Sequence, residues 1–383
     1  MNQQNDNKVN SENISINEPE FTIVESIKPE ATEEHHHHHS GNSKRKKRHK
    51  HHRRHRHHKK TSPVKIIFRT ILILFLVFVV AIAGTFAILR SNGNKSLTTS
   101  ATELDLGDVV EHNGHMYQYN ENLVSIAFIG VDKNELGTVD DNIGTAGQND
   151  TDMLLVFDKS NGEATLLCIP RETMVDVDIY SKTGNFIETQ NVQLCLAFAY
   201  GNGKNTSCEN VTTSMKRILY GVPIDKYFAL DLNGISAIND AMGGVTVESL
   251  YDFENQGIKK GDEIHIEGDF AETYVRQRNM QQIDSSLNRL ERQKQYIRAF
   301  VKQTAKATLK DFSIIKSLYN TSSNYSYTNL SLSDLTYFAS TAISKGTTSF
   351  DTVTLEGTMK SVETDVPDIV NAAFHLDKNK LYE

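Results

Sequence analysis

The longest apolar stretch of the chain is a charge-free run of twenty residues from Thr70 to Leu89. As a helix, this run would extend about 30 Å, which matches the hydrocarbon core of a bilayer. A cleaved signal sequence begins near the N-terminus and has a shorter apolar core, but here about seventy mostly polar residues come first. The pattern therefore predicts an uncleaved transmembrane helix at residues 66–90.

Positive charge is concentrated on one side of this helix. Thirteen Lys and Arg residues lie from Lys44 to Arg69, whereas only Arg90 and Lys95 follow closely after it. Cytoplasmic flanks of membrane helices carry an excess of such residues. We therefore expect a single-pass protein of the cell membrane, with a cytoplasmic N-terminus and an extracellular C-terminal domain.

Residues 1–65 show no apolar periodicity and are rich in Asn, Glu, Ser, Lys, Arg and His. Ordering such a segment costs conformational entropy that little burial offsets, so we expect a disordered, basic and His-rich cytoplasmic tail. Its basic block could bind anionic lipid headgroups at about 1 kcal/mol per cation, bind nucleic acid, or only fix the membrane topology. We favour topology together with contact to lipid headgroups.

The pattern changes again beyond the membrane helix. Residues 91–120 are mostly polar and predict an extracellular stalk, and residues 121–383 carry the alternation expected of a folded domain. Short apolar runs at 124–132, 153–157 and 164–169 predict buried strands. The last two are joined by DKSNGE, whose Asn-Gly pair is a strong signal for a hairpin of antiparallel strands.

Helical and strand-like periods alternate through the rest of the domain. The predicted helices are 192–200, 209–219, 235–242, 287–307, 311–319, 333–344 and 366–374, and the predicted further strands are 227–232, 245–249 and 349–355. Such alternation is typical of a sheet covered by helices. Together with the hairpin, it predicts an α/β fold, a three-layer α/β/α sandwich with a mixed central sheet.

Residues 90–383 contain twenty-six Lys and Arg against forty Asp and Glu, which gives the outer part a net charge of about −14. This balance argues against nucleic acid as a partner, and an anionic substrate would need a local cluster of cations. Three cysteines are too few for a disulfide framework. Cys195 and Cys208 could form one bridge or remain a free buried pair.

Five arginines lie at the ends of predicted elements: Arg171, Arg276, Arg278, Arg289 and Arg292. The planar guanidinium binds phosphate through two parallel hydrogen bonds and keeps its charge, so such arginines are candidates for a phosphate site. The alternative is surface ion pairing with the abundant acids. Among recognised catalytic patterns, we find no nucleophile elbow, Walker phosphate loop, zinc-protease motif or paired C-x-x-C.

Carboxylates also lie at strand ends. Asp132 ends the first strand, and Asp150 and Asp152 precede the strand at 153–157. Oxygen ligands in such places can hold Mg²⁺ beside a phosphate. Turn and strand-capping roles are the alternative for each of them.

Seven segments, taken in order, resemble the LytR-CpsA-Psr family of cell-envelope proteins, over about residues 124–304. They are IGVD, DTDMLLVFD, LLCIPRET, LAFAYGNG, INDAMGGVTV, GDFAETYVRQR and NRLERQKQ. The resemblance implies an α/β sandwich that binds a polyprenyl-pyrophosphate lipid. It also implies a phosphotransferase that moves the attached anionic glycopolymer, of teichoic acid or capsule type, from this donor to the peptidoglycan acceptor.

The resemblance also implies roles for individual residues. By position, Asp132 and Asp150 would be the ligands of Mg²⁺ or a similar divalent cation. The catalytic arginines would be Arg171, Arg276, Arg278 and Arg289, and the further substrate-binding residues would be Gln293 and Arg292.

This sequence departs from the family pattern at four positions. Gln148 stands where the family has a cation, Gln193 and Cys195 replace Lys and Asn, and Ser286 replaces an acid. Loss of two cations leaves a second function open, a regulatory protein that senses envelope lipid through a degenerate site.

Overall fold

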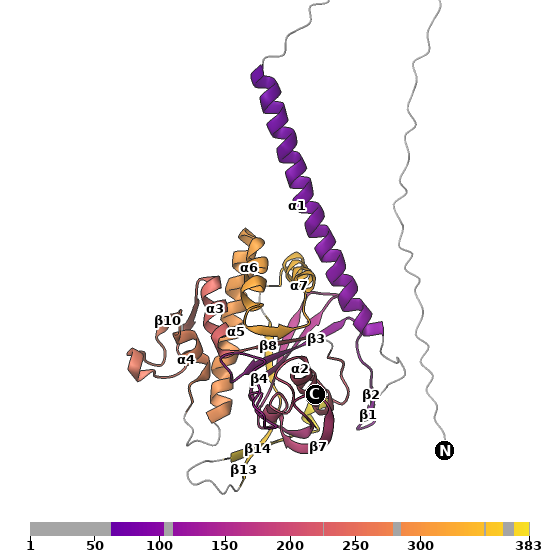
Figure 1. Cartoon of the computed structure of the whole chain (residues 1–383), viewed down its shortest axis with the longest axis vertical. Coiled ribbons are helices and arrows are strands. Elements are labelled where there is room, and N and C mark those ends of the chain that lie inside the picture. Colours follow the sequence, from indigo (N-terminus) through magenta and orange to yellow (C-terminus); the bar gives the residue numbers. More distant parts are fainter. Residues whose placement is uncertain are drawn as a thin grey trace, which may run out of the picture. The chain divides into compact units, whose positions relative to one another are not determined.

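The computed structural model describes residues 63–102, 110–224, 226–278, 285–347, 350–362 and 371–382. Residues 1–62 of the basic tail expected at residues 1–65 lie outside the described residues. The lipid contact expected of this tail lies outside them as well. Within the described part, the chain forms helices and strands in the order drawn in Figure 1.

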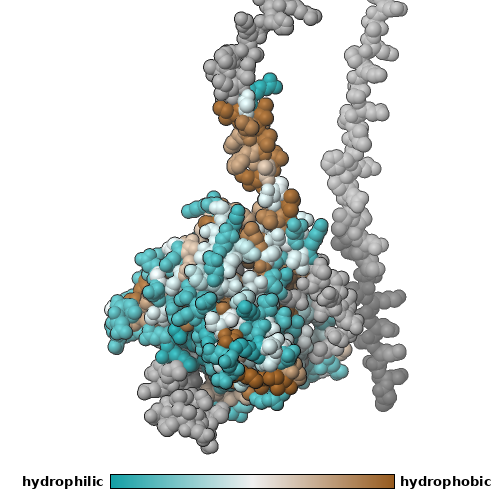
Figure 2. Space-filling model, in the orientation of Figure 1, coloured by the Kyte–Doolittle hydropathy of each residue, from teal (hydrophilic) through white to brown (hydrophobic). Residues whose placement is uncertain are grey.

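The first element is a single long helix, α1 (Pro63–Thr102). Its segment Arg69–Leu97 is long and apolar enough to cross a membrane. Large side chains from Ile71 to Ile82 are exposed along it, and Figure 2 shows hydrophobic colouring along this helix against a largely hydrophilic domain surface. The helix contains the span that the sequence predicts at residues 66–90.

The same helix continues into the segment expected to be a stalk, as far as Thr102. It packs on α7 (Leu332–Lys345). Gly93 lies against the backbone of Ser333, where no side chain would fit, and Leu97 is buried. Polar sequence therefore does not end this helix, because contact with the domain stabilises its last turns. The stalk residues 103–109 lie outside the described residues.

A six-stranded mixed sheet forms the centre of the domain. Its strands, in spatial order, are β11 (Ser326–Thr328), β8 (Lys226–Leu230), β3 (Leu123–Val131), β4 (Asn149–Asp158), β5 (Ala164–Ile169) and β12 (Asp351–Thr354). The pairs β3–β8 and β5–β12 are parallel, and the other neighbours are antiparallel. This is the mixed central sheet that the sequence predicts.

Both faces of the sheet are covered. Alternate residues of β3 point to opposite faces, as the period of a strand requires. Ala127 and Ile129 belong to the core under α2 (Asn205–Ile218), whereas Ile126 packs on the α7 side with Tyr337. The three-layer α/β/α arrangement is therefore confirmed.

A smaller unit flanks the long helix α5 (Ser285–Lys310). It comprises α3 (Leu232–Met242), α4 (Phe270–Arg276) and the ribbon of β9 (Val245–Glu248) with β10 (Glu263–Ile266). Its apolar core contains Tyr274 and Tyr296. Leu290 of the same α5 packs on Met153 of the central sheet. The helix α5 thus joins the flanking unit to the sheet.

The predicted hairpin is confirmed. β4 and β5 pair in antiparallel register from Asp152↔Ile169 to Phe157↔Ala164. Gly162 in the connecting turn has a φ of 77°, a value that glycine adopts without strain. Its N–H donates to the Asp158 carbonyl at 2.8 Å.

Two predicted helices are wrong. Residues 192 and 193 end β7 (Phe186–Gln193), which pairs with β6 (Met174–Tyr180), and a 3-10 turn at Leu194–Leu196 follows. β7 is polar and mostly exposed, so its composition hides the strand. Residues 371–374 of the helix predicted at 366–374 lie in β14 (Asn371–Leu376), which pairs with β13 (Gly357–Val362). Residues 366–370 lie outside the described residues.

Candidate active site

Ends of β3, β4, β5, α4 and α5 surround an open pocket of about 530 Å³. Its lining residues are Asp132, Gln148, Asp150, Arg171, Glu272, Thr273, Arg276, Gln277, Arg278 and Arg289. The structure thus brings together six of the eight residues to which the sequence analysis gave site roles.

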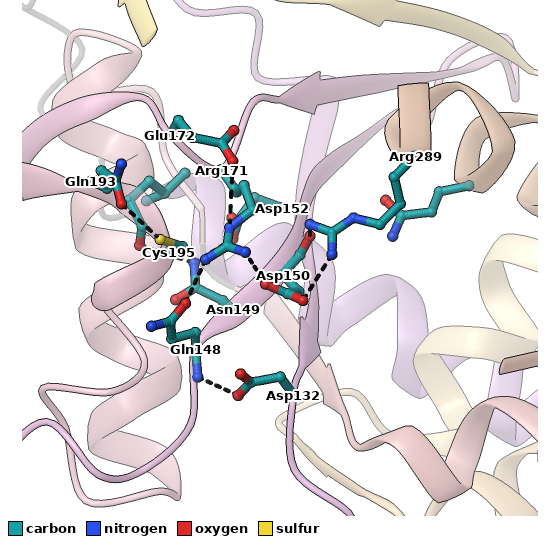
Figure 3. Close-up of polar contacts among 12 residues, drawn as sticks. Asp132, Gln148, Asn149, Asp150, Asp152, Arg171, Glu172, Gln193, Cys195 and Arg289 are labelled. Atoms are coloured by element: carbon teal, nitrogen blue, oxygen red, sulfur yellow. Dashed lines mark hydrogen bonds and ion pairs between the residues drawn. The ribbon is translucent and has the colours of Figure 1, made fainter. Parts of the chain in front are cut away.

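Asp150 lies between two guanidinium groups in this pocket (Figure 3). Arg171 Nη1 is 2.5 Å from Asp150 Oδ1, and Arg289 Nη1 is 2.9 Å from Oδ2. Oδ1 accepts no hydrogen bond of good geometry, so charge holds the Arg171 pair. Arg289 also donates to the Asp150 carbonyl at 3.1 Å. One carboxylate therefore fixes two arginines, one from the turn after β5 and one from α5.

The buried side chain of Asn149 determines where this part of β4 lies. Its amide donates to Asp152 Oδ1 at 2.7 Å and to the Leu194 carbonyl at 3.0 Å. Its oxygen accepts from the Phe198 N–H at 3.0 Å. These bonds satisfy backbone groups of the irregular segment after β7, because buried polar groups need partners. The segment predicted to be helical is held in this way.

Gln148 links Asp132, one of the two metal-ligand candidates, to Arg171. Its N–H donates to Asp132 Oδ1 at 2.6 Å, and its side-chain oxygen accepts from Arg171 Nη2 at 2.5 Å. A cation at this position would repel Arg171, whereas the amide oxygen binds it. Gln148 therefore brings no positive charge to the pocket, but it holds the charged side chain of Arg171 through a hydrogen bond.

Arg278 has no ion pair or hydrogen bond with any residue in the part of the chain that the structure describes. Burial lowers the pKa of its guanidinium, and the charges of Arg289 and Arg171 lower it further. Asp150 and Glu172 raise it only in part. The pocket lining thus holds four arginines against three acids. An anion bound here would relieve that repulsion.

Arg276 lines the same pocket, but its Nη1 also binds Glu272 Oε1 at 2.8 Å, one helical turn away on α4. Its side chain is half exposed. The structure therefore gives it a competing partner that Arg278 lacks among the described residues.

Arg292 and Gln293 do not line the open pocket. Arg292 donates to the carbonyls of Tyr274, at 2.9 Å, and Gln277, and it lies over the Tyr251 ring. Gln293 donates to the Val275 carbonyl at 3.2 Å. Both side chains hold the end of α4, from which Arg276 and Arg278 extend. Contact with substrate remains a prediction for them.

The groups behind Arg171 are buried. Burial opposes the charged form of Arg171, but the neighbouring Asp150 carboxylate raises the pKa of its guanidinium. Burial raises the pKa of Cys195 to about 11, although Arg171 lowers it in part, so the thiol is neutral. Burial likewise raises the pKa of Asp152 to about 8.

Cys195 and Cys208 are both free and buried. Of the two alternatives for this pair, a disulfide bridge or free thiols, the structure shows free thiols.

The sequence analysis gave no role to several residues that line the pocket or lie next to it. Glu172 lies beside Arg171, with 3.9 Å between Oε1 and Nε, and its other carboxylate oxygen is buried without a hydrogen bond. Thr273 and Gln277 line the pocket through α4 and the residue after it. Their closeness in sequence to Arg171, Arg276 and Arg278 was the available signal, but neighbours in sequence can point away from a site.

The pocket can accommodate a magnesium ion in chemical terms. Mg²⁺ in phosphate-handling sites takes one or two carboxylates together with waters and phosphate oxygens. Asp132 and Asp150 supply two carboxylates to the pocket lining. No group of three or more His, Cys, Asp and Glu suited to a metal occurs among the described residues. The donor set therefore fits a cation shared with substrate better than a closed protein site.

The chain is similar to proteins that are named as teichoic acid transferases. The chain is 29% identical over 231 residues to a protein of Halalkalibacterium halodurans named polyisoprenyl-teichoic acid–peptidoglycan teichoic acid transferase TagU, covering 59% of this chain and 68% of that protein. It is 25% identical over 251 residues to the transferase TagV of Bacillus subtilis, covering 63% and 59%. A TagU of Enterococcus faecalis is 24% identical, covering 70% and 80%.

Solved structures share the fold. B. subtilis TagV matches with a TM-score of 0.53 at 22% identity, over 69% of this chain and 94% of that one. The protein gbs0355 of Streptococcus agalactiae matches with a TM-score of 0.54 at 20% identity, over 68% and 84%. The profile of the LytR_cpsA_psr family matches residues 87–380, which is most of the chain. The chain therefore belongs to the LytR_cpsA_psr family.

Proposed function

We propose that this protein is a membrane-anchored phosphotransferase that acts outside the cell. It would take an anionic glycopolymer, of teichoic acid or capsule type, from a polyprenyl-pyrophosphate carrier and attach it to peptidoglycan. The names of the transferases TagU and TagV support this class of reaction. The observation that carries the proposal is the pocket in which Arg171, Arg278 and Arg289 converge.

The arrangement suits phosphoryl transfer, which depends on positioning and charge neutralisation more than on covalent help from the protein. The positive charge of Arg278 is available to bind an anion, because no acid is paired with it among the described residues. Arg171 and Arg289 are fixed by Asp150, so little rearrangement would be needed when substrate binds. A pyrophosphate bridging the three guanidiniums would gain bidentate hydrogen bonds.

In the proposed step, a hydroxyl oxygen of peptidoglycan attacks the phosphorus that carries the glycopolymer. The bond from this phosphorus to the bridging oxygen breaks, and polyprenyl monophosphate leaves with the electron pair. The hydroxyl proton passes to a pocket carboxylate. Arginines around the pocket stabilise the charge that grows on the transferring group and on the leaving phosphate.

We further propose that Asp132 and Asp150 hold a magnesium ion, or a similar divalent cation, together with the substrate. Such an ion would neutralise charge on the phosphate oxygens. Membrane placement is part of the same proposal. The candidate span in α1 and the one-sided basic tail support a single crossing with the domain outside, where peptidoglycan lies.

The test uses the full-length protein in detergent micelles and a polyprenyl-pyrophosphate-linked saccharide as donor. Release of polyprenyl phosphate in the presence of peptidoglycan fragments is measured for Arg278→Ala and Arg171→Ala. We expect losses of at least about a hundredfold in kcat/KM for each, as for removal of an anion-stabilising group. Lys378→Ala, which removes an exposed cation outside the pocket, should retain full activity. Equal activity in all of these proteins would refute the proposal.

The alternative function, a lipid sensor, makes a different demand on the chain. A sensor needs its own cytoplasmic tail, whereas an enzyme needs only an anchor. Replacing residues 1–60 with an unrelated basic sequence should leave transfer unchanged. Loss of an envelope response with transfer intact would favour the sensor.

A further inference from the structure

A second groove, separate from the arginine pocket, runs beside α5. Its volume is about 1090 Å³, and β9 and the segment from Phe350 to Thr352 form its sides. The charged residues along it are Glu291, Lys294, Arg298, Lys302, Lys306 and Asp351. Four cations and two acids thus face a groove on a domain whose outer sequence carries a net charge of about −14.

The four cations form a regular row. Lys294, Arg298, Lys302 and Lys306 are each four residues apart on α5. At 1.5 Å per residue, their backbone positions advance by about 6 Å per step and span about 18 Å. Residues at this spacing are neighbours on a helix surface. The row therefore presents positive charge at regular intervals along one line.

Charge in this row becomes less compensated toward its far end. Lys294 is 2.8 Å from Glu291, and Arg298 donates to the Thr352 hydroxyl at 2.6 Å. Lys302 and Lys306 are exposed and have no ion pair or hydrogen bond to any other described residue. Like charges four residues apart destabilise a helix by a few tenths of a kcal/mol per pair. An unpaired row of this kind is therefore not explained by helix stability.

We infer that this groove binds the glycopolymer of the donor through its repeating phosphates. A single phosphate would need donors that converge on one point, whereas these cations are spread along a line. A phosphodiester-linked polymer carries its charges in the same linear way. A neutral glycan would gain little from exposed lysines, so charge complementarity favours the polyanion.

The position of the groove agrees with this occupant, and the inference rests on the proposed function. Lys294 follows Arg289 by five residues, which is about 7.5 Å along the helix axis and about 140° around it. A donor whose pyrophosphate lies at Arg289 would therefore continue its polymer around α5 and then along the row of cations. The groove would select donors with a charged polymer over donors with a bare saccharide.

The test measures polymer binding apart from catalysis. Full-length protein in detergent micelles is titrated with a fluorescent, lipid-free poly(glycerol phosphate), and anisotropy gives Kd at low and high salt. For Lys302→Gln/Lys306→Gln we expect Kd to rise at least about tenfold at low salt, with a shallower dependence on salt, because fewer counterions are released. The matched control Lys345→Gln/Lys378→Gln, exposed lysines outside the groove, should stay within about twofold of wild type.

Two further measurements separate this inference from the proposed function. The groove variant should transfer a bare saccharide from its donor as fast as wild type does. If the wild-type protein transfers nothing, the proposed function is refuted, but the inference that the groove binds polymer is not. Soluble peptidoglycan fragments serve as the second probe. Wild-type binding of the polymer by the groove variant would overturn the inference. So would weakened binding of peptidoglycan fragments alone, which would assign the groove to the acceptor.

Discussion

Asp150 at the start of β4 and Arg289 in the first turns of α5 are joined twice, through the side-chain ion pair of 2.9 Å and through the Asp150 carbonyl at 3.1 Å. Arg289 is 3% exposed, so this contact is largely shielded from water. The pair connects the central sheet to α5, the helix whose row of cations lines the second groove. The position of α5, which lines both the arginine pocket and the groove, therefore depends on this contact.

The first prediction concerns the shape of this contact. Arg289→Lys retains the positive charge but cannot make both bonds with a planar fork. We expect kcat/KM for transfer to fall about tenfold to a hundredfold, with a smaller effect on the thermal unfolding midpoint. Steady-state kinetics on the purified full-length protein checks this. Equal kinetics for Lys and Arg would mean that charge alone is required.

The second prediction concerns magnesium. Asp132→Asn removes one of two candidate carboxylate ligands and should raise the Mg²⁺ concentration needed for half-maximal transfer at least about tenfold. EDTA should abolish transfer by the wild-type protein, and added Mg²⁺ should restore it. The control Asp311→Asn lies outside the pocket and should titrate like wild type. Full activity in EDTA would exclude the metal.

The third prediction concerns the close approach of α1 to α7. A methyl group on Gly93 would meet the Ser333 backbone, so Gly93→Ala should destabilise the domain by about 1–3 kcal/mol. Gly84→Ala is the matched control, because a methyl group there meets nothing within 4 Å. It should be neutral or slightly stabilising, since alanine favours helix. Thermal unfolding of both variants separates packing from helix propensity.

The fourth prediction concerns pH. Asp231 caps α3, accepting from the Gly234 N–H at 2.8 Å, and burial raises the pKa of its carboxyl to about 6. A raised pKa in the folded state means that stability from this group is present below about pH 4 and is lost as pH rises through about 6. Asp231→Asn retains the cap without the buried charge.

We therefore expect equal stability of the Asp231→Asn variant and wild type near pH 4, and a variant more stable by up to about 3 kcal/mol at pH 7.5, because the shift is about two pKa units. Urea unfolding at the two pH values provides the measurement. A variant that is less stable at pH 7.5 would show that the charge at the helix N-terminus outweighs its burial.

Much of the fold was predictable because local signals agreed with the tertiary structure. The Asn-Gly turn placed β4 beside β5, and the period of residues 287–307 gave α5 almost to its ends. The helix predicted at 192–200 failed because its apolar residues are buried around Asn149, a contact that spans 45 residues between Asn149 and Leu194. No local pattern carries such information. β7 was missed because its side chains are polar and exposed.

The site was predictable as a set of residue types and not as an arrangement. Arginines at the ends of predicted elements and carboxylates at strand ends identified most of the pocket lining. Which arginine lacks an acid partner depends on contacts between elements, so the sequence could not separate Arg278 from Arg276. The use of Gln148 as a partner for Arg171 was equally hidden, because the substitution reads as a loss until the two side chains are seen together.

Continuity of α1 has a consequence for rotation. The candidate span and the turn that carries Gly93 belong to one helix, so both follow a single helical phase. Each residue inserted between them would turn the domain by about 100° and move it by about 1.5 Å. The number of residues between Arg69 and Gly93 therefore sets the direction in which the domain faces around the helix axis, as well as its distance from a membrane. A flexible tether would carry no such directional information.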